Sequence, residues 1–303
     1  MDIRYPLVFA RHNGEPNPEK PADYSHLRGG KPFTADELKA TFGACVGGTN
    51  IYVGINDLNQ DLGAFETNSM PFVQGWIDST PVGERFRIMI GLEPNTFAAP
   101  GAAQYQYVLD NLSIVEKLGA RLKEIMSACQ DQGKTMQTVV RYASEMNRAT
   151  GNPYSGQPGL FQQSYKKVYN ALKSASADIR ISFSPGINPG DMSDIADYWP
   201  GKSWVDMVGC TWYYVGAPDV ERVAAKANLD AYFKAYATAE QPPCVDELGG
   251  AANRSPFGHN EAIYDNMRQH LVNLDLGGLA LEHATFFLAS YWGAGVELDG
   301  LCG

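Results

Sequence analysis

The chain has 303 residues, of which 44% are hydrophobic and 19% are charged, and its formal net charge is -10 at pH 7. This composition supplies one large core, and we expect a single domain over residues 1–303. The negative charge disfavours binding to a phosphate backbone, so no nucleic acid partner is expected. No stretch approaches the roughly 20 uninterrupted apolar residues of a membrane span, so no membrane partner is expected either.

The cysteines are scattered along the chain, and none forms a CxxC pair. This pattern argues against a cysteine metal cluster and leaves room for at most one or two disulfides. Cys210 and Cys244 lie in apolar runs and are expected to be buried free thiols. Residues 1–16 contain too short an apolar stretch for a signal peptide, and we expect a secreted protein whose leader is absent from this sequence. The five cysteines are Cys45, Cys129, Cys210, Cys244 and Cys302.

Short β-type segments alternate with segments of helical periodicity along the whole chain. Such alternation is typical of parallel β/α units rather than of a β-sandwich. Eight strands are the number that closes a (β/α)8 TIM barrel. The expected strands are residues 5–10, 50–55, 86–92, 138–143, 179–184, 205–212, 243–246 and 284–291.

The segments between these strands carry helix signals. Thr34 and Glu37 form a capping box, and Phe33 and Leu38 form a hydrophobic staple around it. Residues 57–84 read as a polar loop with only a short apolar piece, so we expect a rudimentary helix or an insertion there. Apolar residues at three- and four-residue spacing predict further helices at 103–132, 160–175, 217–238 and 259–274.

A doubly wound open sheet would give a similar alternation of strands and helices. A dinucleotide-binding sheet carries a GxGxxG turn after its first strand, and residues 10–21 contain none. A GxxxxGK[ST] phosphate loop is also absent from the sequence. The fold class we predict is therefore α/β, in the form of a (β/α)8 barrel.

Two of the expected strands are followed by a glutamate that lies among other polar residues. Reactive groups in such a barrel lie at the C-terminal ends of strands. The run TVVRYASEMN delivers Arg141, Glu145 and Asn147 at its exit, and PPCVDELGG delivers Asp246 and Glu247 before a Gly-Gly loop. If these are the fourth and seventh strands, the two glutamates arise on opposite sides of the barrel mouth. Singly each would be a solvated carboxylate, but together they predict a catalytic pair.

Hydrolysis of a glycosidic bond with retention needs two carboxyl groups about 5 to 5.5 Å apart, one protonated and one ionised. We predict that Glu247 is the nucleophile and that Glu145 is the general acid/base. This chemistry needs no cofactor and no metal. The predicted partner is a polysaccharide or oligosaccharide, and a monomer is expected.

The first of these motifs resembles a known family. VVRYASEMN is similar to the acid/base strand of clan A glycoside hydrolases, and in particular to the HEMN stretch of glycoside hydrolase family 26. The match lies at Arg141, Glu145, Met146 and Asn147. The family has His before the acid where this chain has Ser144, which changes the residue beside the scissile bond. The resemblance implies a β-linked mannan, glucan or xylan, and Ser144 points to an altered sugar preference.

Two later motifs extend the resemblance over most of residues 138–250. WVDMVGCTWYY resembles the family's sixth strand, YVDWVGxDxY, in which a tyrosine hydrogen-bonds the nucleophile. PPCVDELGG resembles its seventh strand, KPxxxxEFG, which carries the nucleophile. The resemblance therefore implies that Tyr213 lies beside Glu247.

Aromatic residues gather where a sugar-binding cleft would need them, since pyranose rings stack on aromatic planes. Core packing competes with this interpretation for each residue singly. Tyr213 is favoured by the resemblance, and Trp292 because a Trp on the last strand commonly floors the cleft in this clan. The candidates are Trp212, Tyr213 and Tyr214 on one strand, Trp292 on the last, and Tyr154 in a Gly/Pro-rich loop.

Other polar residues lie at strand ends. Glu93 ends the third expected strand and is a candidate for binding substrate or holding Arg141, with a structural salt bridge as the alternative. His12 follows the first strand and is a candidate sugar ligand, with a satisfied loop histidine as the alternative. His283 lies too early in the last strand to reach the active face.

Other functions remain to be weighed. A Schiff-base aldolase needs a desolvated lysine at a strand end, whereas Lys166, Lys167 and Lys173 fall on an expected helix and Lys202 in a loop. The histidines are isolated and form no HxH or HExxH motif, which disfavours metal catalysis. The strongest alternative is a carbohydrate-binding protein on the same barrel that has lost turnover through the change at Ser144.

Overall fold

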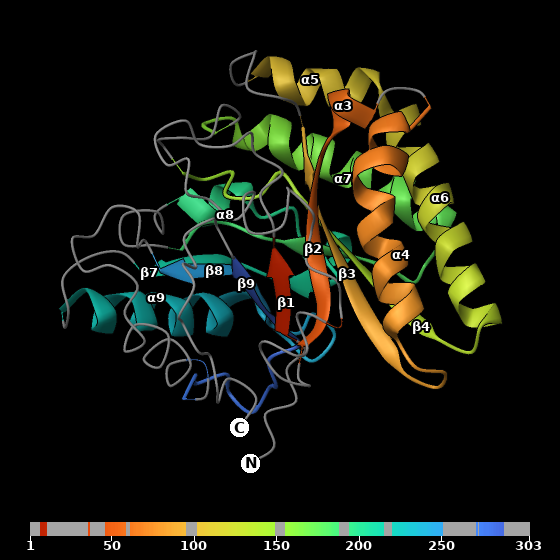
Figure 1. Cartoon of the computed structure of the whole chain (residues 1–303). Coiled ribbons are helices and arrows are strands. Elements are labelled where there is room, and N and C mark those ends of the chain that lie inside the picture. Colours follow the sequence, from red (N-terminus) through yellow and green to blue (C-terminus); the bar gives the residue numbers. More distant parts are fainter. Residues whose placement is uncertain are drawn as a thin grey trace, which may run out of the picture.

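The computed structural model describes residues 7–10, 36, 46–58, 61–94, 102–148, 155–187, 194–214, 220–250, 271 and 273–287. Within these ranges, parallel strands form one sheet in the order β6-β5-β4-β3-β2-β1-β9-β8-β7 (Figure 1). Every predicted strand is present, with ends shifted by a few residues. Their bounds are β1 Leu7–Ala10, β2 Val46–Gly54, β3 Arg85–Glu93, β4 Thr135–Tyr142, β5 Ile179–Phe183, β6 Met207–Val208, β7 Thr211–Tyr214, β8 Val245–Gly250 and β9 Ala284–Phe287.

The predicted strand 205–212 is divided into β6 and β7 by Gly209 and Cys210. An isolated bridge joins Gly186, beyond β5, to Thr211, and a second joins Val208 to Pro243, just before β8. β6 and β7 therefore share one place between β5 and β8. This makes eight places around a closed barrel and confirms the (β/α)8 prediction.

Gly209 is required at this interruption. A Cβ atom built there would collide with the carboxylate of Asp246 and the hydroxyl of Ser182. The missing side chain lets a buried acidic group from β8 approach the backbone between β6 and β7. The interruption between β6 and β7 therefore makes room for the side chains of Asp246 and Ser182 inside the barrel.

Helices cover the outside of the barrel, and one of them corrects the sequence analysis. Residues 57–84 contain no rudimentary helix: a π-helical turn, Phe65–Ser69, runs into a ten-residue helix, α4. The apolar piece PFVQGWI is its buried side, where Val73, Trp76 and Ile77 pack into the core. The helix bounds are α3 Ile55–Leu58, α4 Met70–Ser79, α5 Ala102–Asp110, α6 Leu112–Asp131, α7 Pro158–Ala175, α8 Ile195–Tyr198 and α9 Val220–Tyr236, with a short 3-10 turn at Lys202–Trp204.

The other helix predictions hold in part. The expected helix 103–132 is interrupted at Asn111, which separates α5 from α6. The segments 160–175 and 217–238 correspond to α7 and α9. The capping box around Thr34 and nearly all of 259–274 lie outside the described residues.

The strands bury both faces, and the two faces differ. On β3, Ile88, Ile90 and Leu92 belong to the large core between barrel and helices. Met89, which alternates with them, packs instead with Val139, Met207 and Cys244. Because neighbouring residues of a strand point to opposite faces, this second cluster fills the barrel interior.

The interior is charged beneath this apolar layer. Arg87, near the start of β3, pairs with Glu282 at 2.8 Å, and Arg180 reaches the same carboxylate oxygen at 2.9 Å. Burial opposes the charge of Glu282, but the two guanidinium groups lower its pKa below the usual value. The N-terminal end of the barrel is thereby closed by a structural ion pair. A reactive site is therefore expected at the opposite end, where the strands have their C-termini.

Candidate active site

The backbone of β8 aims two consecutive acidic residues into the barrel. The amides of Asp246 and Glu247 both donate to the carbonyl of Cys210, at 2.9 and 3.3 Å. Two residues opposite one carbonyl form a β-bulge, which interrupts the in-and-out alternation of a strand. Val245 and Leu248 on either side face the outer core. Glu247 therefore joins Asp246 inside the barrel, at the C-terminal end.

Glu247 is held by a buried arginine. Its Oε2 accepts a hydrogen bond from Arg141 Nη1 at 2.5 Å, and the other terminal nitrogen of Arg141 donates to the Thr211 hydroxyl at 2.8 Å. The side chains are 1% exposed for Arg141 and 10% for Glu247. Burial opposes the charge of Arg141, but Glu247, Tyr52, Asp246 and Glu93 together outweigh burial and raise the pKa of the guanidinium. Arg141 was predicted to bind substrate; the structure shows it bound to Glu247, and its contact with substrate stays a prediction.

Tyr52 is a functional candidate that the sequence analysis missed. Its hydroxyl donates to Glu247 Oε2 at 2.7 Å and lies 3.3 Å from Arg141 Nη1. Gly91 on the neighbouring strand makes room, since a Cβ there would collide with the Tyr52 ring. The sequence contains a signal for this position. Asn50 and Tyr52 alternate with the apolar Ile51 and Val53, and this alternation predicts that Asn50 and Tyr52 point into the barrel near the end of β2.

Glu145 lies in a tight turn after β4. Ala143 and Glu145 both adopt positive φ, 48° and 55°, which is uncommon for residues other than glycine and typical of constrained sites. The amide of Glu145 donates to the Ser184 carbonyl at 2.9 Å, which ties the turn to the end of β5. Arg148 Nη1 donates to Glu145 Oε2 at 2.7 Å.

The surroundings of Glu145 favour its protonated form. Burial comes first and the negative charge of Glu247 second, and together they raise the pKa of Glu145 despite the opposing charge of Arg148. The two carboxyl groups thus lie close enough to influence each other. One is held by a buried cation, whereas the other is inclined to keep its proton.

Arg148→Gln should move the alkaline limb of the kcat/KM profile to higher pH. The acid must be protonated to act, so activity falls as pH rises through its pKa. Arg148 favours the carboxylate, so its removal should raise the pKa of Glu145 further. The measurement is the pH dependence of hydrolysis, with Arg121→Gln on α6 as control. A limb that stays in place or moves to lower pH would contradict this role.

Two other residues of the SEMN stretch have specific partners. Ser144 Oγ donates to Glu93 Oε1 at 2.9 Å, so Ser144 links the acid's turn to the end of β3. Asn147 is buried; its amide donates to the Gly186 carbonyl and its carbonyl accepts from the Gly186 amide, each at 2.8 Å. Asn147, predicted to bind substrate, is placed where it fixes the backbone beyond β5.

The aromatic predictions have mixed outcomes. Trp212 is fully buried in the outer core, on the opposite face of β7 from Thr211, which corrects the prediction that it contacts a sugar. Tyr213 and Tyr214 lie in β7, and their side chains are outside what the structure describes. His12, Tyr154 and Trp292 lie outside the described residues.

One set of described residues has the elements of a metal site. The ligand atoms of Cys244, Asp246 and His283 lie within 4.8 Å of one another, and all three residues are buried. His283 Nδ1 lies 2.9 Å from Arg87 Nη1, which can only donate. Nδ1 must therefore accept, and Nε2 carries the proton toward Asp246 at 2.9 Å. These hydrogen bonds occupy the histidine on both nitrogens, so the set fits a hydrogen-bonded cluster better than a cation.

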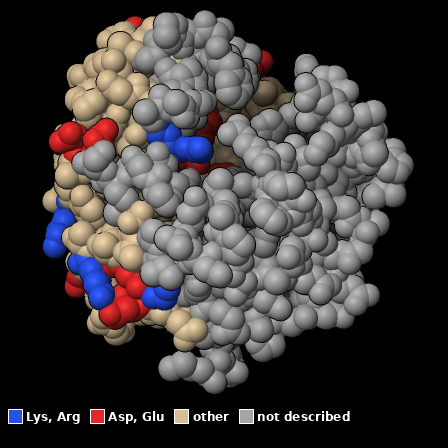
Figure 2. Space-filling view, turned by 90° about the vertical axis from the view of Figure 1, so that its left-hand side faces the viewer, with Lys and Arg blue, Asp and Glu red and all other residues tan. Residues whose placement is uncertain are grey.

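None of the described helices is long and apolar enough to cross a membrane. Figure 2 shows one face of the molecule, on which basic side chains of the described residues lie beside acidic ones rather than in a continuous basic patch.

No protein-family model matches the sequence, and no curated protein is significantly similar to it. Solved structures are similar in fold. An endo-β-1,4-mannanase of glycoside hydrolase family 26 from Cellulomonas fimi superposes with a TM-score of 0.62 at 14% identity, over 93% of this chain. The superposition covers 64% of the mannanase chain, so this chain spans less than two thirds of that protein.

Two further structures agree. A family 26 β-mannanase from Bacteroides ovatus gives a TM-score of 0.58 at 13% identity, over 98% of this chain and 89% of its own. Cel5A from Thermotoga maritima, determined with cellobiose, gives 0.59 at 10% identity, over 84% and 85%. This chain therefore shares the (β/α)8-barrel fold of these two family 26 mannanases and of Cel5A.

Proposed function

We propose that this protein is a retaining glycoside hydrolase in which Glu247 is the nucleophile and Glu145 the general acid/base. The observation that carries the proposal is the contrast between the two carboxyl groups. Glu247 is bound by Arg141 and Tyr52, whereas burial and the charge of Glu247 raise the pKa of Glu145. Retaining hydrolysis needs one ionised and one protonated carboxyl group on the same cleft.

In the first step, an oxygen of Glu247 attacks the anomeric carbon. The bond from that carbon to the departing oxygen breaks, its electron pair stays with the oxygen, and the oxygen takes the proton of Glu145. In the second step, Glu145 removes a proton from water, which attacks the same carbon and releases Glu247 as a carboxylate. Arg141 and Tyr52 keep the attacking oxygen aimed in both steps.

The substrate class we propose is a β-linked polysaccharide or oligosaccharide of the mannan, glucan or xylan type. Support comes from the fold shared with enzymes described as β-mannanases and from the resemblance of the two glutamate strands. We also propose that Glu93 helps to select the bound sugar; the hydrogen bond from Ser144, the residue before the acid, supports this. Secretion and a monomeric state stay predictions.

The test is hydrolysis of a panel of polysaccharides and aryl glycosides by the unaltered protein and by Glu145→Ala. The variant should lose activity on polysaccharides, while aryl glycosides with good leaving groups still form the glycosyl-enzyme. Azide, which needs no general base, should restore turnover and give a glycosyl azide of retained configuration. Glu124→Ala, an exposed glutamate on α6, is the control.

An unaltered hydrolysis rate in Glu145→Ala would rule out the acid/base role. Binding of a polysaccharide without hydrolysis, by the unaltered protein and the variant alike, would identify the alternative, a carbohydrate-binding protein on the same barrel.

A further inference from the structure

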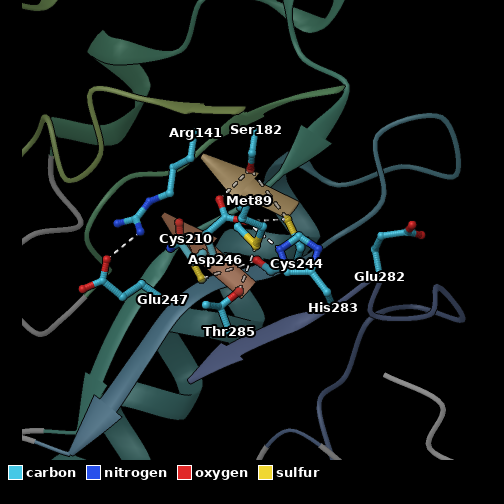
Figure 3. A network of polar contacts seen from close by, with 12 residues as sticks. Met89, Arg141, Ser182, Cys210, Cys244, Asp246, Glu247, Glu282, His283 and Thr285 are labelled. Atoms are coloured by element: carbon cyan, nitrogen blue, oxygen red, sulfur yellow. Dashed lines mark hydrogen bonds and ion pairs between the residues drawn. The ribbon is translucent and has the colours of Figure 1, made fainter. Parts of the chain in front are cut away.

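A second carboxylate lies inside the barrel next to the nucleophile. Asp246 is fully buried, and its oxygens accept hydrogen bonds from Ser182 Oγ at 2.6 Å, from His283 Nε2 at 2.9 Å and from Cys244 Sγ at 3.2 Å. Figure 3 shows these groups converging on Asp246, with the Arg141–Glu247 pair on its other side. All three partners act as donors, as an ionised carboxylate requires.

The partner of Asp246 brings no compensating charge. Since Arg87 donates to His283 Nδ1, the imidazole is the neutral tautomer with its proton on Nε2. Burial lowers the pKa of His283 and keeps it neutral. Burial also opposes the charge of Asp246, but the hydrogen bonds from His283 and Ser182 and the charge of Arg141 hold the pKa of Asp246 below its usual value.

The bulge in β8 therefore supplies two anions, Asp246 and Glu247, to one buried cation, Arg141. The other buried arginine, Arg87, has its own partner in Glu282 at 2.8 Å. In the free protein, Glu247 is the carboxylate that acts most strongly on Arg141. The second anion becomes necessary only when the first one loses its charge.

We propose that Asp246 is a positioning residue that balances the buried charge of Arg141 while Glu247 is esterified. The inference rests on the proposed function, in which Glu247 becomes a neutral ester and Glu145 gives up its proton. The new charge on Glu145 is bound by Arg148 at 2.7 Å. Of the carboxylates that act on Arg141, Asp246 and Glu93 then remain, and Asp246 acts more strongly. A buried cation without a partner would raise the energy of the glycosyl-enzyme.

A double-mutant cycle tests the charge balance without any substrate. Glu247→Gln imitates the uncharged nucleophile, and Asp246→Asn removes the second charge with little change of shape. We expect Asp246→Asn to lower Tm by several degrees more in the Glu247→Gln background than in the unaltered protein. Equal losses in both backgrounds would overturn the proposal. Asp206→Asn, whose partner is Lys173 outside the site, should show no such coupling.

If Asp246→Asn does not fold, Ser182→Ala serves in its place. It removes one hydrogen bond from Asp246 and leaves the charge, so its coupling with Glu247→Gln should have the same sign and a smaller size. Additivity of Ser182→Ala and Glu247→Gln would count against the proposal in the same way.

Kinetics supply a second readout. On an activated aryl glycoside, kcat/KM reports formation of the glycosyl-enzyme and kcat reports its hydrolysis. Asp246→Asn should lower kcat/KM by about 10- to 100-fold without lowering kcat, because it destabilises the intermediate. An equal fall of both would indicate structural damage and reject the proposal. If the unaltered protein hydrolyses no glycoside, the proposed function fails, while the Tm cycle still reports on Arg141 and Asp246.

Discussion

Glu247→Gln is expected to reduce kcat by about 10⁴-fold or more, the scale seen when a covalent nucleophile is removed. Gln keeps the size of the side chain but cannot attack the anomeric carbon. The measurement is the initial rate on the best substrate of the panel, with added azide. In Glu247→Ala, whose shorter side chain leaves space for the anion, azide should restore part of the activity and give a glycosyl azide of inverted configuration, because it attacks from the side that the Glu247 carboxylate occupies in the unaltered protein.

Glu282→Gln is the matched control for that variant, since it changes a glutamate in the structural ion pair at the other end of the barrel. It should affect Tm more than it affects chemistry. A Glu247→Gln protein with more than a tenth of the original kcat would show that Glu247 is not the nucleophile.

Arg141→Met should both destabilise the protein and inactivate it. The change leaves the carboxylates of Glu247 and Asp246 buried without their cation, and breaking such a pair typically costs about 3 to 5 kcal/mol. Glu247 also loses the group that aims it, so kcat/KM should fall by about 10³-fold. Chemical denaturation and kinetics on the same preparation measure the two effects.

Arg121→Met provides the comparison for that experiment. Arg121 pairs with Glu66 on the surface, at 33% exposure, where an ion pair contributes about 1 kcal/mol or less. If Arg141→Met were as stable as Arg121→Met, the buried Arg141–Glu247 pair would contribute no more to the free energy of unfolding than a surface pair, which would contradict the prediction.

The sequence predicted the order of strands well because buried parallel strands are continuous apolar runs, as in the run ending at Leu92. It also predicted that Glu145 and Glu247 lie at strand ends. It misjudged α4, because the Pro and Gly in MPFVQGWIDS conceal a helix whose buried side forms only on packing. It also predicted that Trp212 lines the cleft, because an aromatic residue at a strand end can point to either face of the sheet and its type does not tell which.

The contacts of Arg141 could not be predicted for a different reason. Its partners Tyr52, Thr211 and Glu247 come from three other strands, so their proximity depends on barrel closure rather than on any local pattern. The bulge at Asp246 and Glu247 has no residue signature in PPCVDELGG. Simple alternation would have turned one of the two acidic groups outward.

Because of the bulge, the number of residues in β8 before Glu247 decides how far along the barrel axis its side chain lies. Removing one residue between Cys244 and Glu247 would restore regular alternation, so the glutamate would still face inward, but one strand step of about 3.3 Å deeper, where Asp246 now lies. The shortened chain keeps every residue that touches Glu247 and still loses the reach of its carboxylate into the mouth. The position of the proposed nucleophile in this barrel therefore depends on the backbone spacing in β8 as much as on the identity of its side chain.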